Sequence, residues 1–326
     1  MNRFVWSCAL LSLLLAGCTW TKSEVVSTPG GELPTPAQRA QRCQPNPDKP
    51  RAWPPRLQGT MLWGTAESWL TARRAASGPP GTVLSWAELP GGTPAAGAVL
   101  PGMDGDGRAT EVAICGAQPS KEDPAMVWYQ LEVWNAASHA WENPCVASLE
   151  VPEPRALAVG GVWDRTAAHH DAAGRVTFAC ETGAIAKCAK WGYKPWSGGA
   201  MADLHQACTR MARADYCGDG SSHTREGSPV DVYDPLGVNQ PARSVPPEWS
   251  SAFEAAWAPD GASCIARTRD GRPLESVLAE CPNRFEAVAS DVGDGDRCAV
   301  RRSGAGAPAW RVKNRTLTGA RPLADK

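Results

Sequence analysis

The chain has 326 residues, with 33 basic and 34 acidic side chains and a formal net charge of −1. This balance gives no overall field that would attract a polyanion, so we expect no nucleic-acid partner. The chain is long enough for one large or two modest domains with real cores. It contains 15 Trp against four Phe and four Tyr, and we expect buried Trp to take the place of Phe.

The N-terminus has the pattern of an export signal. Arg3 precedes an apolar run from Phe4 to Ala16, and Leu15-Ala16-Gly17-Cys18 ends it. About a dozen apolar residues cannot span the ~30 Å hydrocarbon core, so we predict a signal peptide at 1–17 and not a transmembrane helix. The tetrapeptide resembles the lipobox of bacterial lipoproteins, in which the cysteine is lipidated and becomes the new N-terminus.

The resemblance implies a lipid-anchored protein of the bacterial cell envelope that contacts the membrane through the lipid on Cys18. We expect the outer membrane and not the inner one. The membrane face, and any protein or glycan partner, stay open. Residues 18–55 are polar and Pro-rich, which predicts a tether. Cys43 should fix its distal end to the domain and leave Thr19 to Arg42 free.

Residues 56–144 are predicted to form a β-rich N-terminal region. Short β-prone runs alternate there, and just beyond it, with Gly/Pro-rich breaks. The predicted strands are Thr60–Trp63, Thr82–Trp86, Glu111–Cys115, Val127–Trp134, Leu157–Trp163 and Val176–Cys180. Turn residues from Asp171 to Gly174 predict a hairpin between the last two runs.

Helical patterns follow. Thr182 can cap a short helix that ends at Gly192. Met201–Arg213 has apolar residues at three- and four-residue steps, and Pro273–Cys281 has the same pattern between two prolines. Phe253–Trp257 and Cys264–Thr268 flank the turn residues Pro259-Asp260-Gly261. The predicted class is α+β, with a β-rich N-terminal half followed by a disulfide-rich region of short helices and hairpins.

Ten cysteines remain after Cys18, an even number, and in an exported protein they predict up to five disulfides. Their pairing cannot be read from the sequence. The ten are Cys43, Cys115, Cys145, Cys180, Cys188, Cys208, Cys217, Cys264, Cys281 and Cys298.

Ala214-Asp215-Tyr216-Cys217 follows the Met201 helix, and Trp191–Trp196 precedes it. These strings resemble the ADYC-domain family of bacterial exported proteins and lipoproteins. Further short matches, including Phe253–Trp257 and Gly261–Cys264, extend the likeness over roughly Cys145 to Cys298. We therefore predict an ADYC-like disulfide-rich domain at 145–300. The family is a domain of unknown function, so the resemblance supplies no catalytic residues and the catalytic set is unknown.

The candidate site, if the motif is functional, comprises five residues in one segment. They are His205, Asp215, Tyr216, Asp219 and His223. Histidine near carboxylates is the usual general-base arrangement, with Ser222 as a nucleophile type. His205, Cys208, Cys217 and His223 could in principle ligate zinc, but their spacing matches no common zinc module.

We favour a structural function for this segment, with Cys208 and Cys217 in disulfides that tie helix to sheet, and we expect no metal and no cofactor. The predicted function is therefore binding or structural, with an unknown ligand. The alternative is an envelope hydrolase centred on His205, His223 and Asp215/Asp219.

Two Asp/Gly segments, Asp104–Gly107 and Asp291–Asp296, faintly resemble calcium loops but lack the EF-hand spacing, so we interpret them as turns. The C-terminus, 301–326, is basic. Anionic envelope polymers are conceivable partners for it, but we expect a solvated tail.

Overall fold

The computed structural model describes residues 33–44, 69–73, 96–103, 109–145, 147, 151–164, 166–172, 175–224, 228–242, 250–304 and 309–318. These residues all belong to one compact unit, 31–326. The signal peptide, Cys18, the predicted strands at 60–63 and 82–86, and the segment 104–107 lie outside the described residues.

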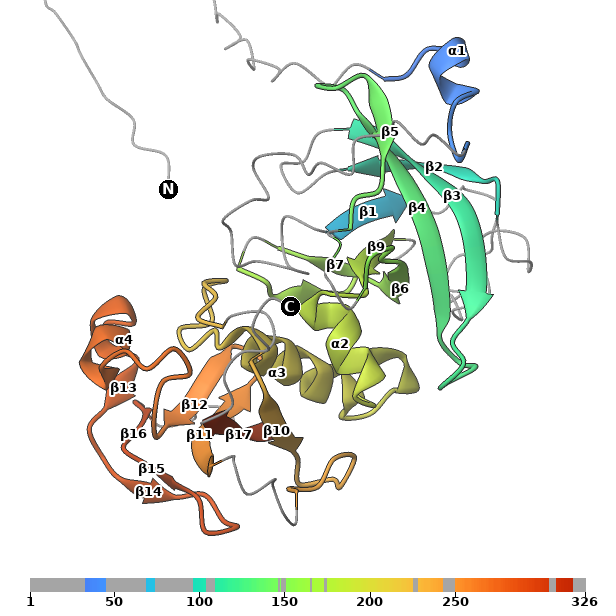
Figure 1. Ribbon diagram of the computed structural model, residues 1–326. Helices are drawn as coiled ribbons and strands as arrows, with labels where there is room; N and C mark the ends of the chain where they lie inside the picture. Colours follow the sequence, from blue (N-terminus) through green and yellow to red (C-terminus); the bar gives the residue numbers. More distant parts are fainter. Residues whose placement is uncertain are drawn as a thin grey trace, which may run out of the picture. The chain divides into compact units, whose positions relative to one another are not determined.

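The first sheet is antiparallel and its pairings form a closed ring (Figure 1). The strand order is β3-β2-β1-β9-β6-β4, and β3 also pairs with β4, while β5 extends the other edge of β4. The bounds are β1 Trp69–Arg73, β2 Val99–Met103, β3 Ala109–Pro119, β4 Val127–Asn135, β5 Ala140–Glu142, β6 Ala156–Gly160 and β9 Arg175–Cys180.

Alternation along these strands separates two cores. Ile114, Tyr129 and Phe178 belong to one apolar cluster, whereas Trp128 and Leu157 belong to another. The second cluster also contains Ile185, Ala186 and Ala189 of helix α2 (Ala184–Lys190). Because successive side chains of a strand point to opposite faces, one cluster fills the ring and the other attaches α2 to its outer surface.

The second sheet is also antiparallel, in the order β10-β17-β11-β12-β16-β13. Its strands are β10 Val230–Tyr233, β11 Ser250–Ala258, β12 Gly261–Ile265, β13 Phe285–Glu286, β16 Val300–Arg302 and β17 Val312–Thr318. Two small pairs, β7 (Val162–Trp163) with β8 (His169–His170) and β14 (Ser290–Asp291) with β15 (Arg297–Cys298), complete the strands described.

Helix α3 (Met201–Arg213) contacts β11, β12 and β17 as well as α2. Its apolar positions Leu204, Ala207 and Met211 pack with Trp257 and Ile265 of the second sheet. The short elements are α1 (Pro36–Arg39), the 3-10 helix η2 (Pro195–Ser197) and α4 (Leu274–Glu280). In the described part of the chain, no helix is long and apolar enough to cross a membrane.

The α+β class is confirmed, and so are several predicted elements. The predicted helices appear as α2, α3 and α4, and β6 pairs with β9 as the turn residues indicated. Three details differ. Gly183, not Thr182, is the N-cap residue of α2. Residues 312–318 form β17 between β10 and β11, so the solvated-tail interpretation is wrong for them. The tether interpretation is wrong for 33–42, because these residues carry α1 and bond to the first sheet.

All ten downstream cysteines are paired, as predicted. The bridges are Cys43–Cys115, Cys145–Cys180, Cys188–Cys208, Cys217–Cys281 and Cys264–Cys298. Cys188–Cys208 joins α2 to α3, and Cys217–Cys281 joins the segment after α3 to the end of α4. Neither ties a helix to a sheet, in contrast to our expectation.

Candidate functional site around the Ala-Asp-Tyr-Cys motif

The motif begins where α3 ends. Ala214 has φ 52° and ψ 43°, and its side chain is fully buried. Its amide bonds to Met211 O and the Asp215 amide bonds to Arg210 O at 3.0 Å, which is the Schellman pattern of helix termination. Glycine is the usual residue in this left-handed position. Gly218 and Gly220 also have positive φ, but they follow later in the turn, and Ala214 ends the helix first.

The Asp215 carboxylate organises the turn that follows. Its two oxygens accept from the amides of Gly218 at 2.9 Å, Asp219 at 3.2 Å and Gly220 at 3.1 Å. Arg210 Nη1 donates to Asp215 Oδ2 at 2.6 Å, and both side chains are buried. Four donors on one carboxylate satisfy its acceptor sites and remove it from solvent.

Arg210 also connects this turn to two other elements. It donates to the carbonyl of Pro259, in the β11–β12 turn, at 3.0 Å and to the carbonyl of Thr166, between β7 and β8. Gln206, one turn earlier on α3, donates to Ala167 O at 2.8 Å and accepts from Trp163 Nε1 at 3.1 Å. The buried polar side chains of α3 therefore hold loops that the apolar pattern alone would not position.

Tyr216 packs between two rings. Its centroid lies 5.3 Å from that of Trp257 and 5.9 Å from that of His223, with nearly parallel planes. Its hydroxyl donates to Glu254 Oε1 at 3.1 Å and accepts from the Arg269 amide at 2.7 Å. Burial, and then the nearby Glu254 carboxylate, raises the pKa of Tyr216 well above its ordinary value. The phenol stays protonated and acts as a packed donor.

Glu254 reaches this core because β11 carries a bulge. The register against β17 passes from Phe253 to Ala255 and leaves Glu254 without a Cα partner. A bulge changes the direction of a side chain, and here it turns the Glu254 carboxylate inward to the buried Tyr216 hydroxyl. Arg269 Nε donates to Glu254 Oε2 at 3.0 Å, and the Asn314 amide donates to the same oxygen at 2.7 Å.

Arg269 also donates to the C-terminal carbonyls of α3, Met211 O at 2.7 Å and Ala212 O at 3.0 Å. A cation at this helix end stabilises the helix dipole. Sequence reasoning missed both partners of this buried ion pair. A glutamate within the apolar run Phe253–Trp257 was the available signal, while nothing local marks Arg269.

The backbone at Cys217 and Gly218 passes very close to the backbone of the β11–β12 turn. A Cβ on Gly218 would collide with the carbonyl of Asp260, and one on Gly261 would lie 2.8 Å from the Gly218 nitrogen. The Ala262 amide donates to Tyr216 O at 3.1 Å across this crossing. The disulfide to Cys281 then fixes the segment to the end of α4. Each of the four motif residues thus has a defined structural role.

The two candidate histidines have separate surroundings. His205 is buried, and its Nε2 lies 2.9 Å from the Ile185 carbonyl. Burial lowers the pKa of His205 to about 4, despite that bond, so the ring is neutral at neutral pH and donates through Nε2. His223 lies 3.6 Å from Glu280, and burial followed by nearby Arg272 lowers its pKa. Asp219 is exposed and accepts from the Ser221 amide.

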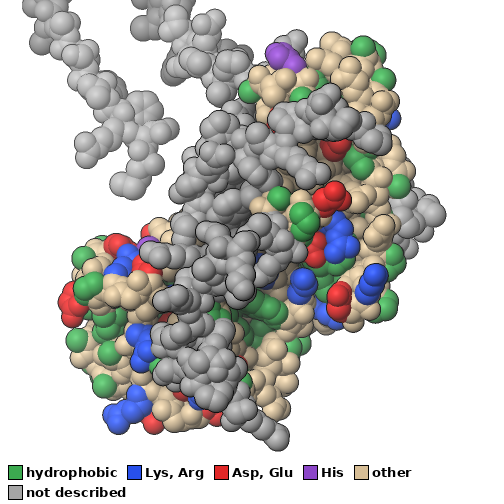
Figure 2. All heavy atoms as spheres, viewed as in Figure 1, with side chains coloured by type: hydrophobic (Ala, Val, Ile, Leu, Met, Phe, Trp, Pro, Cys, Tyr) green, Lys and Arg blue, Asp and Glu red, His purple; other side chains and the backbone are tan. Residues whose placement is uncertain are grey.

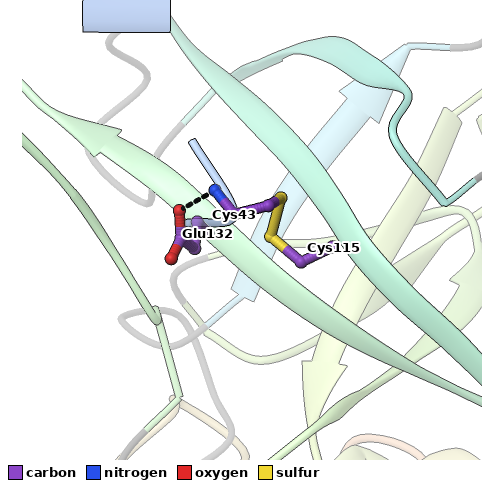
Figure 3. Close-up of side chains that lie close together, drawn as sticks. All are labelled: Cys43, Cys115 and Glu132. Carbon is purple, nitrogen blue, oxygen red and sulfur yellow. Dashed lines mark hydrogen bonds between the residues drawn. A yellow bond between two sulfur atoms is a disulfide. The ribbon is translucent and has the colours of Figure 1, made fainter. Parts of the chain in front are cut away.

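The zinc alternative is excluded by the cysteines. Cys208 and Cys217 are both in disulfides, so neither offers a thiolate to a metal ion. A second grouping, Cys43, Cys115 and Glu132, has its sulfur and carboxylate atoms within 4.8 Å of one another (Figure 3). Its two sulfurs are bonded to each other, and Glu132 accepts from the Cys43 amide at 2.7 Å.

The segment Asp291–Asp296 surrounds the ammonium group of Lys313. Lys313 Nζ donates to Val292 O at 3.2 Å, Gly293 O at 3.1 Å, Asp294 Oδ2 at 2.6 Å and Asp296 Oδ2 at 2.9 Å. The rings of Tyr233 and Trp310 lie about 5 Å from the ammonium, within cation–π range. The faint likeness to a calcium loop thus reflects oxygen ligands arranged around a buried lysine.

The described basic residues near the C-terminus are paired with acids. Five described ones form ion pairs, namely Arg301–Glu286, Arg302–Asp260, Arg311–Asp203, Lys313–Asp296 and Arg315–Asp296. Basic and acidic side chains are also intermixed on the visible face in Figure 2. Such pairing leaves little single-sign field for a polyanion.

The fold and this site define a disulfide-stabilised α+β protein organised around a buried Ala-Asp-Tyr-Cys turn. The ADYC domain matches the chain over residues 92–271, more than half its length, and the chain belongs to the ADYC-domain family. The match begins before the Cys145 boundary that the sequence likeness indicated and includes most of the closed sheet. No curated protein and no solved structure matches this chain.

Proposed function

We propose that the chain is a lipid-anchored protein of the bacterial cell envelope whose disulfide-stabilised ADYC domain has a binding or structural role. The observation that carries the proposal is the pairing of all ten cysteines after Cys18. Disulfides of this number form and persist outside the cytoplasm. Because the ten bond with one another, none of them needs Cys18 as a disulfide partner, which supports the assignment of Cys18 to the lipid.

The geometry of the motif supports a binding or structural role over hydrolysis. His205, Asp215 and Tyr216 are fully buried, and their polar atoms are engaged in hydrogen bonds within the protein. A catalytic group has to reach a substrate, and these three side chains have no surface to offer. The hydrolase alternative would have to depend on Asp219 and His223, the two candidates with some exposure.

The anchoring part is tested by Cys18→Ser, with Cys8→Ser as the matched control within the predicted signal. In a bacterial host, the wild type and the control should fractionate with membranes and carry acyl mass, because multiple acyl chains exceed the threshold for stable attachment. Cys18→Ser should lack acyl mass and accumulate as uncleaved precursor or in the soluble fraction. A Cys18→Ser protein that matures and fractionates like the wild type contradicts the proposal.

The binding or structural role is tested by using the mature protein as bait in envelope extract. In parallel, the same purified protein is screened for hydrolase activity. A specific retained partner or polymer supports binding. Hydrolysis of an envelope substrate that is lost in His223→Ala or Asp219→Asn, with stability unchanged, would support the alternative.

A further inference from the structure

The five disulfides differ in their access to solvent. In the described part of the chain, Cys43–Cys115 is the one bridge with both cysteines outside the buried class. Seven of the other eight cysteines are 5% exposed or less, and the eighth, Cys217, is bonded to the buried Cys281. Thiol–disulfide exchange requires a thiolate to reach a sulfur, so this bridge is the accessible one.

A bulge places this bridge beside a carboxylate. The β3–β4 register passes from Ile114 to Gly116, which leaves Cys115 without a Cα partner. Ala113, two residues earlier, pairs with Glu132 on β4 and belongs to the apolar cluster that Cys115 and Cys43 also contact. The Glu132 carboxylate lies within 4.8 Å of both sulfurs and accepts from the Cys43 amide (Figure 3).

We propose that Cys43–Cys115 is a thiol-exchange site and that Glu132 selects its reductant by charge. An attacking thiolate forms a mixed disulfide with one sulfur, and the other cysteine leaves as a thiolate. The second thiol of the reductant, as a thiolate, then attacks the reductant's own sulfur in the mixed disulfide, and the bound cysteine leaves as a thiolate, so that the dithiol is oxidised and both cysteines are reduced. Because the exchange uses two thiols, the partner is a dithiol. Because both steps bring negative charge toward Glu132, the reacting face of this dithiol is neutral or cationic.

The exchange acts on the N-terminal arm, residues 33–44, which connects the proposed lipid anchor to the domain; this consequence rests on the proposed function. Besides the disulfide, the arm is attached through Arg39 to Glu111, through the Cys43 amide to Glu132 and through Trp141 Nε1 to Gln38 O. Reduction would leave these contacts as its noncovalent attachment to the first sheet. The redox state of one bridge would then decide whether the anchor-bearing arm is covalently fixed.

The test measures reduction kinetics of the full-length protein in detergent at low salt. Cysteamine and 3-mercaptopropionate serve as reductants of opposite substituent charge, with rates normalised to thiolate concentration. Samples are quenched with iodoacetamide, and alkylation at each cysteine is mapped by mass spectrometry. Glu132→Gln is the variant, because it keeps shape and a carbonyl acceptor for the Cys43 amide, and Glu132→Asp retains the charge.

We expect Cys43 and Cys115 to be alkylated before any other pair, and cysteamine to react several-fold faster than 3-mercaptopropionate. One carboxylate acting on one thiolate at about 5 Å in water corresponds to a rate effect of about fourfold, so Glu132→Gln should accelerate reduction by about that factor. The acceleration should shrink at high salt, and Glu132→Asp should resemble the wild type.

Earlier reduction of another bridge, or equal rates for the wild type and Glu132→Gln, would overturn the proposal. Hydrogen exchange of the Arg39 and Ala40 amides, which bond within the arm, should accelerate on reduction. Unchanged exchange would refute the effect on the arm. These measurements do not depend on lipidation, so their failure is distinguishable from failure of the Cys18→Ser fractionation.

Discussion

Replacing Asp215 by Asn should destabilise the protein strongly although the two side chains have the same shape. The carboxylate accepts three backbone amides and Arg210 with no exposure to water. An asparagine keeps one acceptor oxygen and points an NH₂ group at two of these donors. It also leaves the Arg210 guanidinium, 2% exposed, without its counter-charge. Breaking a buried pair from one side costs about 3–5 kcal/mol, and we expect a loss in that range.

Asp203→Asn provides the matched control on the same helix. Asp203 is about half exposed and lies 3.3 Å from a partly exposed Arg311, so its loss should cost less than about 1 kcal/mol. The assay is equilibrium urea unfolding of unreduced protein, followed by Trp fluorescence. An Asp215→Asn variant within about 1 kcal/mol of Asp203→Asn would refute the conclusion that this carboxylate holds the turn together.

Three further predictions concern other parts of the molecule. Removing the Cys217–Cys281 bridge by the double alanine variant opens a crosslink between residues 64 apart, for which chain entropy predicts a loss of about 4 kcal/mol in the free energy of unfolding. Equal stability in urea would contradict it. His205 has a folded pKa of about 4 against 6.5 unfolded, so the unfolded state binds the proton first. The contribution of neutral His205 to the free energy of unfolding is complete above about pH 6.5. It is lost as the pH falls toward 4, by up to about 3 kcal/mol. His205→Gln should flatten this part of the pH–stability curve, and an unchanged slope would refute the prediction. Lys313→Met should cost about 2 kcal/mol in urea unfolding, because buried Asp296 loses a charged hydrogen-bond donor and keeps Arg315 as its counter-charge; a neutral effect would show that the lysine is dispensable.

Local patterns were sufficient for α2, α3 and α4, but not for α1, which lies in the segment predicted as a tether. Met201, Leu204, Cys208 and Met211 recur at helical steps, and α3 has the predicted bounds. The cysteine count predicted the disulfides, because an even number in an exported chain has one common explanation. Which cysteines pair depends on contacts between distant elements, which no local pattern contains.

Buried polar residues account for most of what the sequence did not reveal. In β17 the side chains of Lys313, Asn314 and Thr316 are buried, and a single sequence makes such residues appear solvated. They are buried because distant acids, Glu254 and Asp296, accept their hydrogen bonds. The bulge in β11 that turns Glu254 inward likewise has no local sign. For the same reason, the motif could be recognised from its letters, while the buried ion pair of Asp215 with Arg210 needed the structure.

The most direct test of the whole account is one intact-mass measurement. Protein extracted from membranes is denatured without reduction, alkylated with iodoacetamide and weighed. The account predicts a chain that starts at Cys18, carries acyl mass and gains no alkyl groups, because all ten remaining cysteines are paired. A chain without acyl mass, or one with two or more alkylated cysteines, would contradict it.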